Sequence, residues 1–271
     1  MFSPSKIKEI ASGFGFSPSK QMEQNFLIDK NILAKIISAA DLKKEDTVLE
    51  IGPGLGVLTE ELSLRAGMVT AVEADKKLAA VLRKRFKNIK DLKIVEEDFL
   101  KINLAGLGLL SGYKVVANLP YSITSAAIRK IMEADPRPSA AVLMVQKEVA
   151  ERICATAGDM SLLALSVQYY GTPKLLFKVS KGCFWPSPKV DSAVIKLVMD
   201  KKRNSEEAER FFRIARMGFS SPRKQLQNNL SSGLHIPKEK SVELLNRAKI
   251  NPKARPEDLS VSDWERLAQT G

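Results

Sequence analysis

The 271-residue chain contains one histidine, two cysteines and no long apolar run. No segment approaches the roughly 20 consecutive apolar residues of a membrane-spanning helix, and the first residues lack the apolar core of a secretory signal peptide. We therefore expect a cytoplasmic protein that binds no membrane. The spacing of Cys154 and Cys183 fits no metal site, and His235 is the only histidine available for a catalytic triad. We expect neither a bound metal nor a histidine-based triad.

Negative charge is also scarce, because 31 Asp and Glu stand against 43 Lys and Arg. The net charge of +12 and the pI of about 9.6 favour a polyanionic partner such as nucleic acid, although a solvated lysine-rich surface would have the same composition. Apolar residues make up 44% of the chain and charged residues 27%, which is typical of a soluble globular protein. The length suits one large domain and one small domain.

Residues 46–62, DTVLEIGPGLGVLTEEL, contain an apolar run, a glycine turn and a helical pattern in that order. This order predicts the first strand, turn and helix of a nucleotide-binding α/β sheet. Gly52 and Gly54 would let the backbone turn tightly and approach a ligand closely. The spacing G-x-G-x-G is a weak signal by itself, because ordinary strand-to-helix turns also contain glycines.

Polar residues end the apolar runs that surround this turn. Glu73 lies 23 residues after Glu50, Asp98 lies 25 residues after Glu73, and Asn118 lies 20 residues after Asp98. The carboxyl ends of parallel strands form the ligand-binding edge of an open α/β sheet, where Glu73 is placed to accept hydrogen bonds from a ribose. A single acid here could be a solvated strand end, but three polar residues in register with a glycine turn predict a nucleotide site.

The remaining pattern predicts two domains. Strands that alternate with helices indicate a mostly parallel sheet with helices on both faces, and the β-rich runs 173–180 and 192–199 predict an antiparallel edge. Beyond residue 200 the pattern becomes helical, with 15 Lys and Arg against 10 Asp and Glu. We therefore predict that residues 1–199 form the sheet domain and that residues 200–271 form a small basic helical domain.

The segment Asn118-Leu119-Pro120-Tyr121 closes the fourth predicted strand and suits an adenine. The exocyclic amine of adenine is a poor nucleophile, because its lone pair is delocalised into the ring. The Asn118 side-chain oxygen and the Leu119 carbonyl, held by the rigid Pro120, would accept hydrogen bonds from the amine and aim its lone pair. Tyr121 offers an aromatic face on which the base can stack. A structural turn with a core tyrosine could have the same sequence, so the position beside a nucleotide site supports this interpretation.

Several motifs occur in an order that resembles one enzyme family, namely SPSKQMEQNFL, EIGPGLG, VEAD, EDFL, NLPY, FWPSPKVDSAV and GFSSPRKQLQNNL. From about residue 7 to the C-terminus, the chain resembles the KsgA-type ribosomal RNA adenine dimethyltransferases. The resemblance implies a Rossmann-like class I methyltransferase fold, S-adenosylmethionine as methyl donor, and dimethylation of two adjacent adenines near the 3′ end of small-subunit (16S) rRNA. It also implies a precursor of the 30S ribosomal subunit as partner and a role in small-subunit biogenesis. We expect the protein to be a monomer.

The resemblance assigns roles to individual residues. The cofactor site would comprise Asn25, Leu27, Gly52, Gly54, Glu73, Asp98 and Asn118, with Glu73 on the ribose and Asp98 on the adenine amine. The catalytic segment would comprise Asn118, Leu119, Pro120, Tyr121 and Phe184, with Tyr121 and Phe184 flanking the target base. Taken alone, Phe184 and its neighbour Trp185 would fit packing better than a base contact. The charge of the tail, and not the resemblance, predicts that Arg213, Arg216, Arg223 and Lys224 bind RNA phosphates.

The chain departs from the family pattern at two places. Glu23 stands where the family usually has glycine before QNFL, and Met160-Ser161 stands where it usually has Tyr-Gly. These departures bring into question the local backbone and the charge at the mouth of the site, but not the class of reaction.

Other functions compete with this interpretation. The glycine spacing disfavours a nicotinamide-dependent dehydrogenase, and no histidine stands near a strand end. DNA adenine methyltransferases usually have an acid where Asn118 stands, and they need a larger target-reading domain. An antibiotic-resistance methyltransferase of large-subunit rRNA shares most of the motifs, and a ribosome-assembly factor could keep the fold and act mainly by binding. The motifs SSPRKQLQNNL and FWPSPKVDSAV favour the small-subunit enzyme.

Overall fold

The computed structural model describes residues 9, 12–13, 24–199 and 203–270, which belong to two compact units. The first unit comprises Met1–Ala150 and Lys174–Met199, and the second comprises Glu151–Pro173 and Asp200–Gly271. The second unit therefore includes residues 151–173, which the sequence pattern placed with the sheet. In the described part of the chain, no helix is long and apolar enough to cross a membrane.

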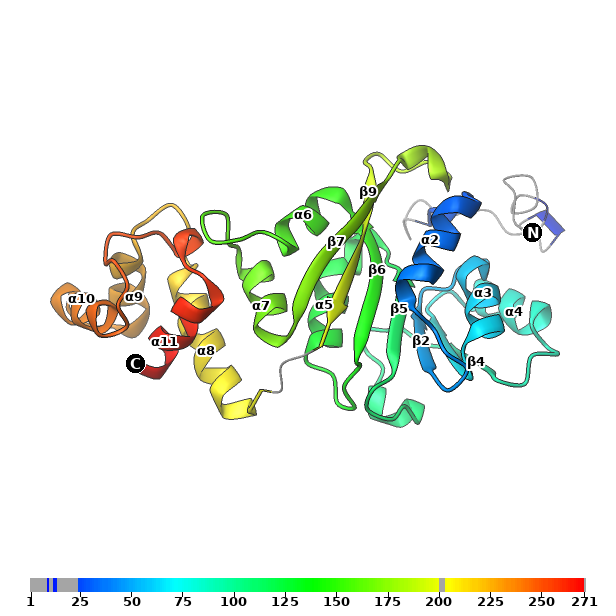
Figure 1. Ribbon diagram of the computed structural model, residues 1–271, viewed down its shortest axis with the longest axis horizontal. Coiled ribbons are helices and arrows are strands. Elements are labelled where there is room, and N and C mark those ends of the chain that lie inside the picture. Colours follow the sequence, from blue (N-terminus) through cyan, green and yellow to red (C-terminus); the bar gives the residue numbers. More distant parts are fainter. Residues whose placement is uncertain (1–8, 10–11, 14–23, 200–202, 271) are drawn as a thin grey trace. The chain divides into compact units, whose positions relative to one another are not determined.

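A seven-stranded sheet with the order β4-β3-β2-β5-β6-β9-β7 organises the first unit (Figure 1). Its strands are β2 (Thr47–Ile51), β3 (Met68–Glu73), β4 (Leu92–Glu96), β5 (Lys114–Asn118), β6 (Ala140–Gln146), β7 (Thr172–Val179) and β9 (Ser192–Val198). The five strands from β4 to β6 pair in parallel, whereas β9 runs antiparallel to β6 and β7 lies outside β9. The predicted mostly parallel sheet with an antiparallel edge is confirmed.

Helices cover both faces of the sheet, which is why its central strands are buried and mostly apolar. The helices α2 (Lys30–Ala40), α3 (Val57–Arg65) and α4 (Lys76–Arg85) pack on one face, where they share a core with Val48, Val69, Val116 and Val142. Behind the strands in Figure 1 lies α5 (Thr124–Met132), which buries Ile128, and α6 (Lys147–Ile153) follows β6. Short 3₁₀ turns span η1 (Leu104–Leu107), η2 (Tyr121–Ile123) and η3 (Lys181–Cys183).

The strand order changes direction between β2 and β5, which are neighbours although two strands separate them in the chain. From β2 the chain proceeds outward through β3 to β4, and then returns to β5 on the other side of β2. Ligands of open α/β sheets bind at such a point, outside the carboxyl ends of the strands. The glycine turn after β2 and Asn118 at the end of β5 both lie there.

The second unit is helical and has its own apolar core. Its helices are α7 (Leu162–Tyr170), α8 (Ser205–Gly218), α9 (Leu226–Leu234), α10 (Lys238–Arg247) and α11 (Val261–Thr270), with a 3₁₀ turn η4 (Pro256–Asp258). Trp264 and Phe211 are fully buried, and the Tyr169 ring of α7 stacks on Phe211 with ring centroids 4.0 Å apart. This shared core explains why residues 151–173 join the C-terminal helices.

The two departures from the family pattern fall in different places. Met160 is buried in the core of the second unit. The Ser161 hydroxyl accepts a hydrogen bond from the Ala164 N–H at 3.1 Å and caps α7. Both residues therefore have structural roles in the helical unit. Glu23 lies outside the described residues.

Candidate functional site

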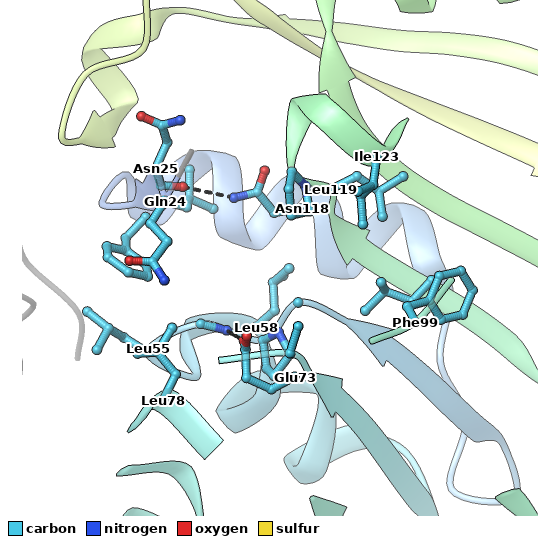
Figure 2. Close-up of a pocket in the computed structure, with 18 of the residues that line it drawn as sticks. Gln24, Asn25, Leu55, Leu58, Glu73, Leu78, Phe99, Asn118, Leu119 and Ile123 are labelled. Carbon is cyan, nitrogen blue, oxygen red and sulfur yellow. Dashed lines mark hydrogen bonds between the residues drawn. The ribbon is translucent and has the colours of Figure 1, made fainter. Parts of the chain in front are cut away.

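A pocket with a volume of about 270 Å³ opens at the carboxyl ends of β2, β3 and β5. Its lining includes every residue that the sequence analysis assigned to the cofactor or to the catalytic segment, namely Asn25, Leu27, Gly52, Gly54, Glu73, Asp98, Asn118, Leu119, Pro120, Tyr121 and Phe184. In Figure 2, Asn118 and Leu119 lie on one side of the pocket and Glu73 and Leu55 on the other. The structure thus brings these residues together, whereas their individual roles stay predictions.

Glu73 is joined directly to the glycine turn. Its Oε2 accepts a hydrogen bond from the Gly54 N–H at 3.0 Å, and its Oε1 accepts one from the Asp75 N–H at 2.9 Å. The side chain is only 6% exposed, and burial raises the pKa of this carboxyl above its usual 4.5, although the backbone N–H donors partly oppose the shift. Each carboxylate oxygen retains a lone pair, so Glu73 can still accept hydrogen bonds from a ligand in the pocket.

The middle glycine of the turn is required by its surroundings. Gly54 has a φ of +59°, and a Cβ there would lie 2.9 Å from the Phe26 ring. Phe26 belongs to β1 (Phe26–Leu27), which pairs antiparallel with β8 (Phe184–Trp185). The sequence analysis did not anticipate this small sheet. Through it, the QNFL and FWP segments join the wall of one pocket.

The Asn118 side chain has a defined orientation. Its Nδ2 donates a hydrogen bond to the Asn25 main-chain carbonyl at 3.1 Å, the contact drawn as a dashed line in Figure 2. Because only the NH₂ end of an amide can donate to a carbonyl, this contact assigns Oδ1 to the other side of the group. The side-chain oxygen of Asn118, Oδ1, is therefore available as an acceptor in the pocket.

The backbone after Asn118 offers a second acceptor. The Leu119 N–H donates to the Met144 carbonyl at 3.1 Å, and the Pro120 carbonyl accepts from the Thr124 hydroxyl at 3.0 Å. The Leu119 carbonyl, by contrast, accepts no hydrogen bond from the residues that the structure describes. Two acceptors, the Asn118 Oδ1 and the Leu119 oxygen, thus adjoin the pocket on a segment held at both ends.

The turn that contains Asp98 forms part of the pocket wall, and a lysine that the sequence analysis did not single out holds it in place. Asp98 Oδ1 accepts from the Leu100 N–H at 2.9 Å, and the Lys130 ammonium of α5 donates to the Leu100 carbonyl at 3.0 Å and to the Ile102 carbonyl at 2.5 Å. The same ammonium lies 5.3 Å from the centroid of the Phe99 ring. Lys130 therefore ties this turn to the helix that follows the catalytic segment.

A second buried acid lies beneath the glycine turn. Glu50 of β2 is 1% exposed, and neither carboxylate oxygen has a hydrogen-bond partner among the described residues. Burial is the largest cause and raises the pKa of Glu50 to about 8; the nearby Thr59 partly opposes the shift, and the charge of Glu73 adds to it. At neutral pH this carboxyl is therefore mainly protonated.

The four cations predicted to bind RNA all belong to the second unit. Arg213 and Arg216 lie on α8, three residues apart, and Arg223 and Lys224 follow in the connection to α9. All four are exposed, and none forms an ion pair with another residue of the described chain. Such cations are available for phosphate contacts.

Apolar residues of the pocket were missed because their sequence signal is ordinary. Leu55, Leu58, Leu78, Phe99 and Ile123 all line the cavity. Each stands close to a recognised motif, but an apolar residue in such a position has the same pattern as a core residue. Among the described residues, no group of three or more His, Cys, Asp or Glu side chains has a geometry that could hold a metal ion.

The fold and this pocket together define a class I methyltransferase, and solved structures of a dimethyladenosine transferase and of an rRNA methyltransferase share the architecture. A dimethyladenosine transferase from Plasmodium falciparum superposes with a TM-score of 0.76 at 28% identity, covering 89% of this chain and 95% of that one. The 23S rRNA methyltransferase ErmE superposes with a TM-score of 0.72 at 29% identity, covering 91% of this chain and 99% of that one.

The sequence comparisons define the family. The family model described as ribosomal RNA adenine dimethylase matches residues 15–270. Proteins called ribosomal RNA small subunit methyltransferase A are 48% identical in Dehalococcoides mccartyi and 40% identical in Clostridium botulinum. The first match covers 97% of this chain and 91% of the relative, and the second covers 96% of each. The chain belongs to the ribosomal RNA adenine dimethylase family.

Proposed function

We propose that this protein transfers methyl groups from S-adenosylmethionine to N6 of two adjacent adenines near the 3′ end of small-subunit rRNA. In this proposal it acts as a cytoplasmic monomer on a precursor of the small ribosomal subunit. The observation that carries the proposal is the hydrogen bond from Asn118 Nδ2 to the Asn25 carbonyl, because it leaves Oδ1 available as an acceptor for the adenine amine. Family membership and the names of the relatives support the choice of substrate.

The pocket suits a nucleoside cofactor. Glu73 would accept hydrogen bonds from the two ribose hydroxyls, and Asp98 would accept one from the adenine amine. Apolar side chains, among them Leu78 and Phe99, would cover the faces of the cofactor's adenine ring. Asn25, Leu27, Gly52 and Gly54 would border the remainder. When bound, S-adenosylmethionine supplies an electrophilic methyl group.

Catalysis in this proposal is positioning combined with electrostatic stabilisation. The Asn118 Oδ1 and the Leu119 carbonyl would accept hydrogen bonds from the two N–H groups of the target adenine's amine and thereby raise the nucleophilicity of its nitrogen, which would release one proton to water after each methyl transfer. Tyr121 and Phe184 would stack on the base after it leaves the RNA helix. Pro120 fixes the backbone between the acceptor pair and the aromatic platform. No side chain in this scheme has to act as a general base.

The cations of the second unit would hold the substrate RNA. Arg213, Arg216, Arg223 and Lys224 are exposed, and phosphate contacts from such residues contribute affinity without reading sequence. The choice of adenine would then come from the pocket.

The test is methyl transfer from labelled S-adenosylmethionine to isolated small ribosomal subunits, followed by mapping of the modified nucleotides. We expect label in two adjacent N6,N6-dimethyladenosines near the 3′ end of the rRNA. Large subunits serve as the control. Label in large-subunit RNA alone would contradict the proposed substrate, and specific binding to small subunits without any transfer would identify an assembly factor instead.

A further inference from the structure

The Tyr121 hydroxyl lies 2.8 Å from the Ser192 hydroxyl, a contact between residues that are 71 positions apart in the chain. Ser192 is the first residue of β9 and is 0% exposed, whereas Tyr121 is half-buried and lines the pocket. A stacking role for Tyr121 needs only its aromatic face. The hydroxyl contact is therefore a separate feature of the site.

Ser192 stands at the start of β9, where several hydrogen bonds hold the backbone. It lies opposite Gln146 in the β6–β9 pairing, and the preceding residue, Asp191, accepts hydrogen bonds at both its main chain and its side chain. The Asp191 carbonyl accepts from the Lys147 N–H at 3.0 Å, and Asp191 Oδ1 accepts from the Lys181 N–H at 2.9 Å. The partner of Tyr121 is thus held on a strand whose start is fixed from two directions.

The same contact joins the two aromatic walls of the proposed base site. Phe184 lies in the segment from Lys181 to Asp191, whose two ends are joined by the hydrogen bond from the Lys181 N–H to the Asp191 carboxylate. In the small sheet, Phe184 pairs with Leu27. Tyr121 comes from the other wall, at the end of β5. Ser192 therefore links the Tyr121 wall to the segment that carries Phe184.

We propose that Ser192 is a positioning residue that holds the Tyr121 ring, by its hydroxyl, at the spacing from Phe184 that a target adenine needs. The inference rests on the proposed function, since it deepens the role of the base site. A ring that is already fixed loses less conformational freedom when the base stacks on it. Ser192 acts through Tyr121 and has no contact of its own with the reacting atoms.

The two partners differ in how the loss of the contact affects the fold. Ser192→Ala leaves the Tyr121 hydroxyl in a half-buried position, where water can replace the lost partner. Tyr121→Phe leaves a fully buried serine hydroxyl without a partner, which is the more costly loss. The double variant removes both hydroxyls. We therefore expect Tyr121→Phe to lower the melting temperature, and the added Ser192→Ala to restore part of it.

The experiment is a double-mutant cycle on the full chain, with isolated small ribosomal subunits as substrate. We expect Ser192→Ala to lower kcat/KM for the subunit by about 3- to 10-fold, the factor associated with one neutral hydrogen bond, and to leave the Kd for S-adenosylmethionine unchanged. The double variant should lose no more catalytic efficiency than Tyr121→Phe alone. Ser139→Ala is the matched control, because Ser139 donates to the Gly112 carbonyl at the other end of β6.

Each outcome decides the inference. Wild-type efficiency for Ser192→Ala, or losses that multiply in the double variant, would overturn the positioning role, and so would a matching loss of cofactor affinity. If Ser192→Ala does not fold, Tyr121→Phe decides alone, because the anchor predicts a loss of kcat/KM and stacking alone predicts none. A wild-type protein that transfers no methyl to adenine would overturn both this inference and the proposed function.

Discussion

Substitution of Glu73 by glutamine is the most informative test of the cofactor site, because it preserves shape and removes one charge. In the structure, both carboxylate oxygens accept main-chain hydrogen bonds, one from Gly54 and one from Asp75. A glutamine can accept only one of them, since its NH₂ end would meet the other N–H as a second donor. The variant therefore loses the charge that would meet the ribose and also loosens one anchor of the glycine turn.

The expected magnitude follows from the hydrogen bonds that the charge would make. A hydrogen bond to a charged group contributes about 1.5–3 kcal/mol, so the affinity for S-adenosylmethionine should fall by roughly 10- to 150-fold. Isothermal titration calorimetry of the folded variant measures this directly. Glu96→Gln is the matched control. Glu96 lies opposite Glu73 in the β3–β4 register, but its side chain forms an ion pair with Arg83 at the surface and does not line the pocket.

The pH dependence provides a second readout for the same residue. Burial raises the pKa of Glu73 above 4.5, and the ionised carboxylate is the stronger acceptor for ribose hydroxyls. Affinity should therefore weaken as the pH falls through this raised pKa, and Glu73→Gln should abolish that titration. A folded Glu73→Gln protein that binds the cofactor like the wild type, with the same pH profile, would refute the assignment of Glu73 to the ribose.

Three further predictions concern the catalytic segment, the buried acid and the basic tail. Asn118→Ala removes an acceptor for the adenine amine, so single-turnover methyl transfer should slow by about 100-fold or more with little change in cofactor affinity; a fast variant would contradict the acceptor role. Glu50 has a folded pKa of about 8, so its protonated form contributes stability that is complete below pH 4.5 and is lost as the pH rises toward 8. In urea unfolding between about pH 5 and 8, the free energy of unfolding of the wild type should fall by about 1.4 kcal/mol per pH unit, and Glu50→Gln should abolish this fall. Parallel pH curves for both proteins would exclude this titration. Replacing Arg223 and Lys224 together by alanine should reduce the slope of log K against log salt for rRNA binding by up to about 2, and an unchanged slope would place the RNA surface elsewhere.

The sheet and the polar edge of the pocket were predictable because their signals are local. Each strand is a short apolar run, and the polar residue that ends it necessarily lies at its carboxyl end. In a parallel sheet these ends meet at one edge, so Glu73 and Asn118 could be placed together from their spacing alone. This inference holds whichever strands are neighbours in the sheet.

The features that were missed depend on contacts between distant segments. The pairing of Phe26 with Trp185 joins two segments of only two residues each, which are too short to carry a strand pattern. The Lys130 contact with the Leu100 carbonyl and the Ser192 contact with Tyr121 involve side chains of ordinary type at unremarkable positions. A lysine on a helix or a serine at a strand start has no signature until the fold supplies its partner.

The charge of the pocket is opposite to the charge of the chain. The protein carries a net charge of +12, yet the cavity lining, as far as the structure describes the chain, includes the acids Glu73 and Asp98 and no lysine or arginine. Two main-chain N–H groups hold the carboxylate of Glu73, whereas Glu50 beneath the turn is mainly protonated at neutral pH and adds little charge. A cavity of this kind favours a cationic ligand such as a sulfonium and disfavours phosphate groups. The exposed arginines of the second unit have the reverse preference. This separation of charge favours a division in which the RNA backbone stays on the surface and only an uncharged base enters the pocket to meet the methyl donor.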